Sequence, residues 1–218
     1  TLAALLIYFG KITGQHTFHF GIPVHKRSSK RERNMVGMFS GILLFNGEYS
    51  KEQTLSELLR SINSSLRNDY RHQNYPIGNL SRDLKIHTSD GYLHEVSVNY
   101  EPLNFELDFG PDIHAKIARI ANENDRNPLQ ICWREYGNHQ GLELHIHYLL
   151  EYFNREEIDL LTKRILYLLD QFVGNYDQPI DTFDILPQEE KEELHGFNDT
   201  QVLFPPDRSI IDLFEEQV

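Results

Sequence analysis

Histidines, scattered aspartates and one cysteine are the residues of this chain whose types could do chemistry. His16 and His19, and His145 and His147, are the nearest thing to metal-binding pairs. His145 and His147 lie two residues apart in an apparent strand, so both side chains would point to the same face, as two zinc ligands could. A third ligand at a suitable spacing is missing. The pattern therefore favours structural or exposed histidines, and we expect no metal.

The other candidates give no catalytic signature. Asp108, Asp112 and Asp125 are scattered across predicted loops and form no carboxylate pair for general acid–base catalysis. Cys132 lies in QICWREY, an apparent strand without a thiolate-stabilising pattern, so a small core residue is favoured over a catalytic thiol. Gly-x-Ser-x-Gly, Walker, His-Glu-x-x-His and Cys-x-x-Cys motifs are also missing from the sequence.

Hydrophobic periodicity predicts three long helices that could position such residues. Each has a local start or stop signal: a C-terminal glycine, a capping box or an N-cap asparagine. The helices are 2–13, ending before Gly14; from the capping box Ser50-Lys51-Glu52-Gln53 to about Tyr70; and 155–173, between Asn154 and Gly174.

Five segments read as strands because they alternate or are continuously apolar between turn residues. The first is predicted to close at Gly21 and Pro23, and the last two form a hairpin across GNHQG. The predicted strands are 16–24, 41–46, 91–101, 129–136 and 142–150. Helices and strands together predict an α/β fold.

Composition narrows the class of protein. The chain has 218 residues, of which 39% are hydrophobic and 25% charged, which is typical of a globular protein. A formal net charge of −12 argues against nucleic acid as a partner, because phosphate binding needs surplus Lys and Arg. A single cysteine cannot form an internal disulfide, which favours a cytoplasmic location.

The two ends of the chain suggest a piece of something longer. TLAALLIYFG is too short to span a bilayer and lacks the basic flank of a signal peptide, so we expect no membrane segment. Residues 177–208 contain four prolines and many acidic residues, as a linker would. Residues 209–218 begin a new amphipathic helix.

The order of several segments resembles the second half of a condensation domain of a nonribosomal peptide synthetase, continuing into an adenylation domain. Val36-Gly37-Met38-Phe39 is similar to the family's fifth motif, Ile/Val-Gly-x-Phe-Val-Asn-Thr, and His72-Gln73-Asn74-Tyr75-Pro76 to its sixth, His/Asn-Gln-Asp-Tyr-Pro-Phe-Glu. The other segments, in order, are ALLIYFGKITGQHTFHFGIPVHKR, EIDLLTKRILYLLDQFV, ILPQEEKEELHGFNDT and SIIDLFEEQV.

The sequence departs from the family pattern in four places. Ser40-Gly41 replaces Val-Asn of the fifth motif, and Asn74 replaces Asp of the sixth. Residues 125–129 look like the seventh motif, Arg-Asp-x-Ser-Arg-Asn-Pro-Leu, but come too late; 93–98 sits nearer the expected place. The catalytic signature His-His-x-x-x-Asp-Gly would lie upstream of this chain, so we expect no catalytic residue here and no activity from the fragment alone.

The resemblance implies a chloramphenicol-acetyltransferase-like half domain, with a mixed sheet packed against helices and an extended C-terminal linker. It divides the chain into a C-terminal subdomain (1–176), a linker (177–208) and the first adenylation helix (209–218). One wall of the substrate tunnel would be formed by five residues: Gly37, Met38, Phe39, Ser40 and Gly41. The alternative is a tight strand entry without ligand contact.

Three further roles are implied. His72, Gln73, Asn74, Tyr75 and Pro76 would form a subdomain crossover or a structural corner. The basic run that contains Lys30, Arg31 and Arg33 is either a solvated loop or a docking surface for acidic carrier domains. The reaction would be amide-bond formation between thioesters carried on the phosphopantetheine of partner carrier domains, with no cofactor bound directly.

The remaining implied partners are the upstream half of the domain and a downstream adenylation domain, in a multidomain enzyme of peptide antibiotic or siderophore biosynthesis. Three alternatives stay open: an epimerisation domain of the same fold, a non-catalytic interaction domain, and an acyltransferase that uses free coenzyme A. The linker after Asp177 disfavours the last. The amino acids condensed, the donor stereochemistry, the product and the oligomeric state do not follow from the sequence.

Overall fold

Two compact units make up the computed structural model, which describes residues 1–86, 93–103, 127–136, 141–201 and 208–217. The first unit is Thr1–Ile185 and the second is Leu186–Val218. The second contains the helices α6 (Gln188–Asn198) and α7 (Ile210–Glu215), the latter agreeing with the helix predicted after residue 208. Within the described ranges, no helix is long and apolar enough to cross a membrane.

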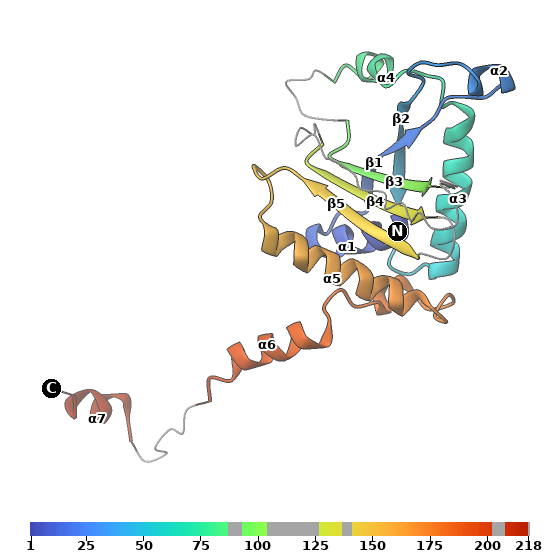
Figure 1. The fold of residues 1–218 in the computed structure, drawn as a ribbon. Helices are drawn as coiled ribbons and strands as arrows, with labels where there is room; N and C mark the ends of the chain where they lie inside the picture. The colour runs from blue at the N-terminus through green and yellow to red at the C-terminus, as the bar shows by residue number, and fades with distance from the viewer. Residues whose placement is uncertain (87–92, 104–126, 137–140, 202–207, 218) are drawn as a thin grey trace, which may run out of the picture. The chain divides into compact units, whose positions relative to one another are not determined.

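A mixed five-stranded sheet forms the centre of the first unit, in the order β2-β1-β3-β4-β5 (Figure 1). The β1–β2 and β4–β5 pairs are antiparallel, and β1–β3 and β3–β4 are parallel. The predicted hairpin is therefore confirmed as β4–β5. The strands are β1 (Thr17–Val24), β2 (Gly41–Glu48), β3 (Val96–Leu103), β4 (Leu129–Tyr136) and β5 (Leu142–Tyr148).

Gly21 and Pro23 lie inside β1, which corrects the prediction that they close the strand. Pro23 is opposite Ile42 of β2. On its other side, within the described residues, β1 pairs with β3 at Phe20 and Gly21 and not at Pro23. Pro23 thus lies where the strand has a single neighbour, a position that tolerates a residue without an N–H.

Three helices pack on one face of the sheet: α1 (Leu2–Thr13), α3 (Leu55–Arg71) and α5 (Arg155–Phe172). Alternate strand residues and the inner faces of these helices form one hydrophobic core. The sequence predicted one apolar face for α1, but its residues 3–8 are all buried. The core side chains with the lowest exposure include Leu5, Phe20, Phe45, Leu55, Leu58, Ile131, Ile165 and Leu168.

The start of α3 is a second correction. The helix begins at Leu55, not after Ser50, and its capping box is Thr54 with Glu57. The reason is a pairing with a distant segment: Thr54 bridges Pro179, the Leu55 N–H donates to the Gln178 carbonyl at 3.1 Å, and the Ile180 N–H donates to the Gln53 carbonyl at 2.9 Å. Residues 51 and 52 form a turn, and the bonds at Gln53 and Leu55 pair the chain with the distant segment, so the helix starts only after Thr54.

The same pairing draws residues 177–185 into the first unit, although composition places them in a linker. Ile180 has an exposed fraction of 0% and Phe183 of 3%, and Phe183 meets Phe172 edge to face at 5.2 Å between ring centroids. Gln171 binds the Asp184 backbone through both its amide nitrogen and its amide oxygen. The compact unit ends at Ile185, nine residues beyond the predicted boundary.

Two short α-helices of the first unit were not predicted, and neither was α6, which lies in the predicted linker. α2 (Lys30–Arg33) lies in the basic run, where Ser29 and Glu32 form a capping box. α4 (Ile77–Asp83) follows the corner at Pro76. Figure 1 shows both helices at the same end of the first unit, near the N-terminal end of β2.

Candidate functional site

Four of the five predicted tunnel residues, 37–40, lie between α2 and β2. The fifth, Gly41, is the first residue of β2. Gly37 has φ of +150°, a backbone conformation that side chains with a Cβ rarely adopt. A Cβ at Gly41 would lie 2.4 Å from the end of the flexible Lys26 side chain, which would have to move aside. The structure therefore gives a conformational reason for Gly37, while the tunnel role of the segment remains a prediction.

Arg27 connects this segment to the end of β1, and the sequence analysis did not single it out. Its guanidinium donates to the carbonyls of Met35 at 2.7 Å and Gly37 at 2.8 Å, and also to that of Glu32. The guanidinium carbon lies 4.1 Å from the centroid of the Phe39 ring, a cation–π contact. One side chain thus binds three carbonyls and one ring of the loop.

A second set of bonds closes the same loop at α2. The N–H groups of Ser28 and Ser29 donate to the Glu32 carboxylate at 2.9 and 2.7 Å, and the Glu32 N–H donates to Ser29 Oγ at 3.1 Å. The hydrogen bonds from Ser29 are the main reason why the pKa of Glu32 lies below its usual value. The capping box stays intact as long as Glu32 is ionised.

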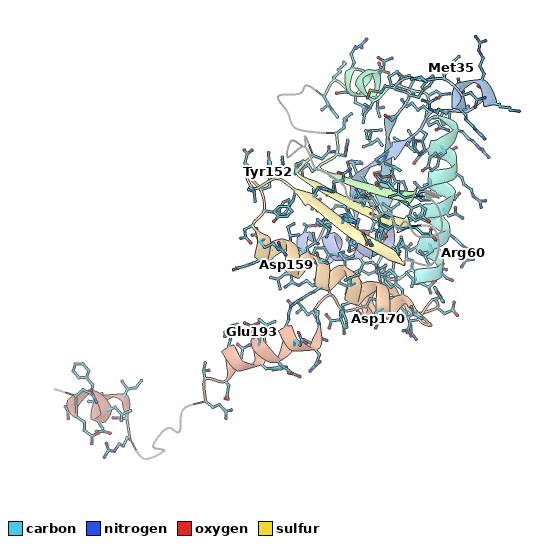
Figure 2. The ribbon with its side chains drawn as sticks, viewed as in Figure 1. Met35, Arg60, Tyr152, Asp159, Asp170 and Glu193 are labelled. Carbon is cyan, nitrogen blue, oxygen red and sulfur yellow. The ribbon has the colours of Figure 1, made fainter. Side chains whose placement is uncertain are left out.

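The tip of the segment is apolar and exposed. Val36 has an exposed fraction of 105% and Met38 of 92%, while Met35, labelled in Figure 2 near α2, is 39% exposed. Burying a Val or Met side chain contributes about 1.5–3 kcal/mol, which these two residues do not gain in the first unit. Phe39, by contrast, is partly covered beneath Arg27.

The predicted corner does connect two elements. His72 caps α3, and the Tyr75 N–H donates to its carbonyl at 2.9 Å. The Tyr75 hydroxyl donates to the Asp83 carboxylate, which ties the corner to the far end of α4. Pro76 is the N-cap residue of α4. The helix break at Pro76 is therefore confirmed, and the crossover role stays a prediction.

Basic side chains gather on two helices. Lys30, Arg31 and Arg33 are all exposed on α2. The second group, which sequence analysis missed, lies on α3 around a hollow of about 420 Å³. A spacing of three, four or seven residues puts its members on one side of the helix, and this spacing was the signal that could have revealed them. The lining residues are Arg60, Asn63, Ser64, Arg67, Asn68 and Arg71.

Polar residues of β3, β4 and β5 share the sheet face opposite the core, here called the polar face. The register places Glu101 beside Arg134 and Asn99 beside Cys132. Arg134 is 2% exposed, and its Nε donates to Glu101 at 2.7 Å. A charge buried this deeply needs its partner, because a lone buried charge costs several kcal/mol. The members are Ser97, Asn99, Glu101, Gln130, Cys132, Arg134, Glu143, His145 and His147.

Cys132 is confirmed as a buried residue. Burial, and then the neighbouring Glu101 carboxylate, raise the pKa of the Cys132 thiol to about 12. The thiol therefore stays protonated near neutral pH and cannot act as a thiolate nucleophile.

The histidine pair on β5 lies on one face, as its spacing predicts. His145 Nε2 is 2.8 Å from the Glu143 carboxylate. In the part of the chain that the structure describes, no three His, Cys, Asp or Glu residues could hold a metal ion. Asp108, Asp112 and Asp125 fall outside the described residues, as do the first two residues of the possible seventh motif at 125–129.

Comparison with known proteins identifies the family. The sequence profile of the condensation domain matches residues 1–195 of this chain. The chain belongs to the condensation-domain family. Tyrocidine synthase 3 of Brevibacillus parabrevis is 26% identical over 220 residues, a match that covers 100% of this chain and 3% of that protein.

Solved condensation domains have the same fold. The starter condensation domain of rhizomide synthetase superposes with a TM-score of 0.68 at 21% identity, covering 85% of this chain and 44% of that one. The X-domain complex with OxyB from teicoplanin biosynthesis gives a TM-score of 0.73 at 18% identity, covering 86% and 42%. The chloramphenicol-acetyltransferase-like fold is thereby confirmed, and this condensation-domain chain spans less than half of either matched chain.

Proposed function

We propose that this chain is the C-terminal half of a condensation domain that forms an amide bond between thioesters on two carrier domains. The observation that carries the proposal is the family match over residues 1–195, together with a fold that accounts for 44% of a solved condensation domain. In this proposal the amine of the acceptor attacks the donor acyl thioester. The C–N bond forms, the C–S bond breaks, and the donor carrier's phosphopantetheine leaves as a thiol.

The segment from Gly37 to Gly41 would supply one wall of the substrate tunnel. Support comes from its position between α2 and β2, where Gly37 and Ser40 are both exposed. This chain contains no adjacent histidines, so another part of the parent protein would contribute the catalytic signature. The parent would then act as an acyl-transferring enzyme.

Partners follow from the same proposal. Carrier domains bring the substrates on phosphopantetheine, and the exposed Lys30, Arg31 and Arg33 offer them a basic docking surface, since carriers tend to be acidic. The domain would end at Ile185, where the compact unit ends. Residues 186–208 would form the linker, and α7 would begin an adenylation domain.

The test uses the intact parent module with its carriers loaded with donor and acceptor thioesters. We expect amide product from the unmodified module. Ser40→Leu should lower the turnover rate by about tenfold or more, because a displaced substrate loses reactive geometry. The matched variant Ser61→Leu, on the exposed surface of α3, should leave the rate unchanged.

Two results would contradict the proposal. Equal rates for Ser40→Leu and Ser61→Leu would remove the segment from the tunnel wall. A loaded, folded module that makes no amide bond but inverts the donor stereocentre would favour an epimerisation domain. The second candidate function is a protein-interaction domain, because the teicoplanin X-domain is bound to OxyB in its structure. A folded module that neither forms an amide bond nor inverts the donor stereocentre would favour this candidate.

A further inference from the structure

One row of side chains on the polar face contains buried polar atoms that have no hydrogen-bond partner among the described residues. They are both ring nitrogens of His94, the hydroxyl oxygen of Ser97 and Nε2 of His147. Ser97 has an exposed fraction of only 1%. A buried donor or acceptor that is left unpaired destabilises a fold, and proteins contain few such groups. Several of them in one row therefore indicate a site for a further polar group.

The strand register shows that these side chains are neighbours. Gly21 of β1 pairs with Ser97 of β3. Gln130 of β4 lies between Ser97 and His147 of β5. The His94 ring completes the row, because a Cβ at Gly21 would lie 2.2 Å from it. The ring thus occupies the space that a side chain at position 21 would need, and adjacent members of the row are separated by about one strand spacing of 4.8 Å.

The charges on the polar face decide what kind of group fits the row. Glu101 accepts hydrogen bonds from Asn99 and from Arg134, whose Nη2 is also buried and unpaired. Glu143 lies on the same face, 2.8 Å from His145 Nε2. Burial lowers the pKa of His94, so its imidazole is neutral near pH 7. A neutral ligand that both donates and accepts suits these surroundings better than an anion.

A carboxamide has this chemistry. Its oxygen can accept from the Ser97 hydroxyl while its N–H groups donate to an imidazole nitrogen, whereas a carboxylate only accepts and a thioether has no N–H or O–H to donate. The row is also near the proposed tunnel wall. Gly41 pairs with Val24, which lies three residues after Gly21 on β1, or about 10 Å along the strand. A peptidyl substrate that lay against that wall would be long enough to reach the row.

We propose that the row formed by His94, Ser97, Gln130 and His147 binds a side-chain carboxamide of the substrate, so that the domain selects for a substrate residue such as glutamine. This inference rests on the proposed function, because the substrates of a condensation domain are aminoacyl and peptidyl groups. A site that hydrogen-bonds a polar group discriminates strongly against analogues without that group, because its own polar atoms are then left unpaired.

The test is calorimetric titration of the intact parent module with three probes that share one backbone. The probes are the methyl esters of N-acetylglutamine, N-acetylmethionine and N-acetylglutamate, which place a carboxamide, an apolar group of similar length and a carboxylate at the same position. We expect the glutamine probe to bind about tenfold or more tightly than either of the others.

Two variants locate the binding in the row. Ser97→Ala removes one hydroxyl and should weaken binding of the glutamine probe about tenfold while leaving the methionine probe unchanged. Gly21→Ala should do the same by displacing the His94 ring, and Gly21 has no positive φ that alanine would strain. The matched controls are Ser61→Ala on the exposed surface of α3 and Gly78→Ala, where a Cβ meets no neighbouring atom. Both controls should bind like the unmodified module.

Equal affinities for the three probes would overturn the proposed site, and so would a Ser97→Ala module that binds the glutamine probe as tightly as the Ser61→Ala module. Ser97→Ala decides the matter alone if Gly21→Ala does not fold. Amide-bond formation is measured separately in the unmodified module. A module that forms the bond without a preference for the glutamine probe would refute this inference alone, and one that shows the preference but forms no bond would refute only the proposed function.

Discussion

Cys132 and Arg134 occupy successive positions on the polar face, and burial affects them in opposite ways. Arg134 cannot lose its proton in a protein, so the fold supplies Glu101 at 2.7 Å to balance its charge. Cys132 can stay neutral, and the same carboxylate helps to keep it so. Both residues thus depend on Glu101, which lies on the neighbouring strand β3.

At the residue scale, the Cys132 thiol should make folding sensitive to alkaline pH. Its pKa is about 12 in the fold, against an ordinary value of 9.0, so above pH 9 the unfolded chain loses this proton first. The unfolded state then binds fewer protons, and the free energy of unfolding falls as pH rises from 9 to 12, by at most about 1.4 kcal/mol per pH unit. Urea unfolding at several pH values, compared with Cys132→Ala, measures the difference; identical pH slopes would contradict it.

Elements in this protein begin where tertiary pairing allows. α5 starts at a strong local signal: the sequence predicts Asn154 as the N-cap, and in the structure Asn154 caps the helix and forms a capping box with Glu157. α3 has an equally plausible signal at Ser50, but residues 51–54 are paired with the segment around Pro179. Both α3 and α5 have a capping motif in the sequence. For α3, the pairing with the segment around Pro179 decides that Thr54, and not Ser50, caps the helix.

Thr54→Ala should therefore destabilise the domain, whereas Ser50→Ala should not. The Thr54 hydroxyl accepts a hydrogen bond from the Glu57 N–H, and removing an N-cap of this kind costs about 1 kcal/mol. The Ser50 hydroxyl donates to the exposed Glu52 carboxylate and does not cap α3. Urea unfolding of both variants checks this expectation, and a larger loss for Ser50→Ala would restore the helix start predicted from sequence.

At the scale of the whole molecule, the packing of residues 177–185 determines where the domain ends. Residues 177–185 look like a linker in composition, yet they contribute Ile180 and Phe183 to the core and hold the start of α3. A domain cut at residue 176 would expose the side chains that these two residues cover. The compact unit therefore needs the segment up to Ile185.

Ile180→Ala should lower the free energy of unfolding by about 2–5 kcal/mol, because the side chain is fully buried and its loss leaves a cavity. Ile210→Ala is the matched control: Ile210 is 78% exposed in α7, and its truncation should change stability by less than about 0.5 kcal/mol. The measurement is urea unfolding of the intact domain with its C-terminal segment attached. Equal stability of the two variants would show that residues 177–185 belong to the linker and not to the folded unit.

The sequence by itself determined the α/β class, the β4–β5 hairpin, the start of α5 and the burial of Cys132. These features depend on periodicity and caps within about twenty residues, which neighbouring side chains encode directly. Only the tertiary structure decided the start of α3, the packing of Ile180 and the Arg134–Glu101 pair. Each of these joins a residue to a partner that no local pattern specifies, because the fold selects the partner by bringing distant backbone and charged groups together.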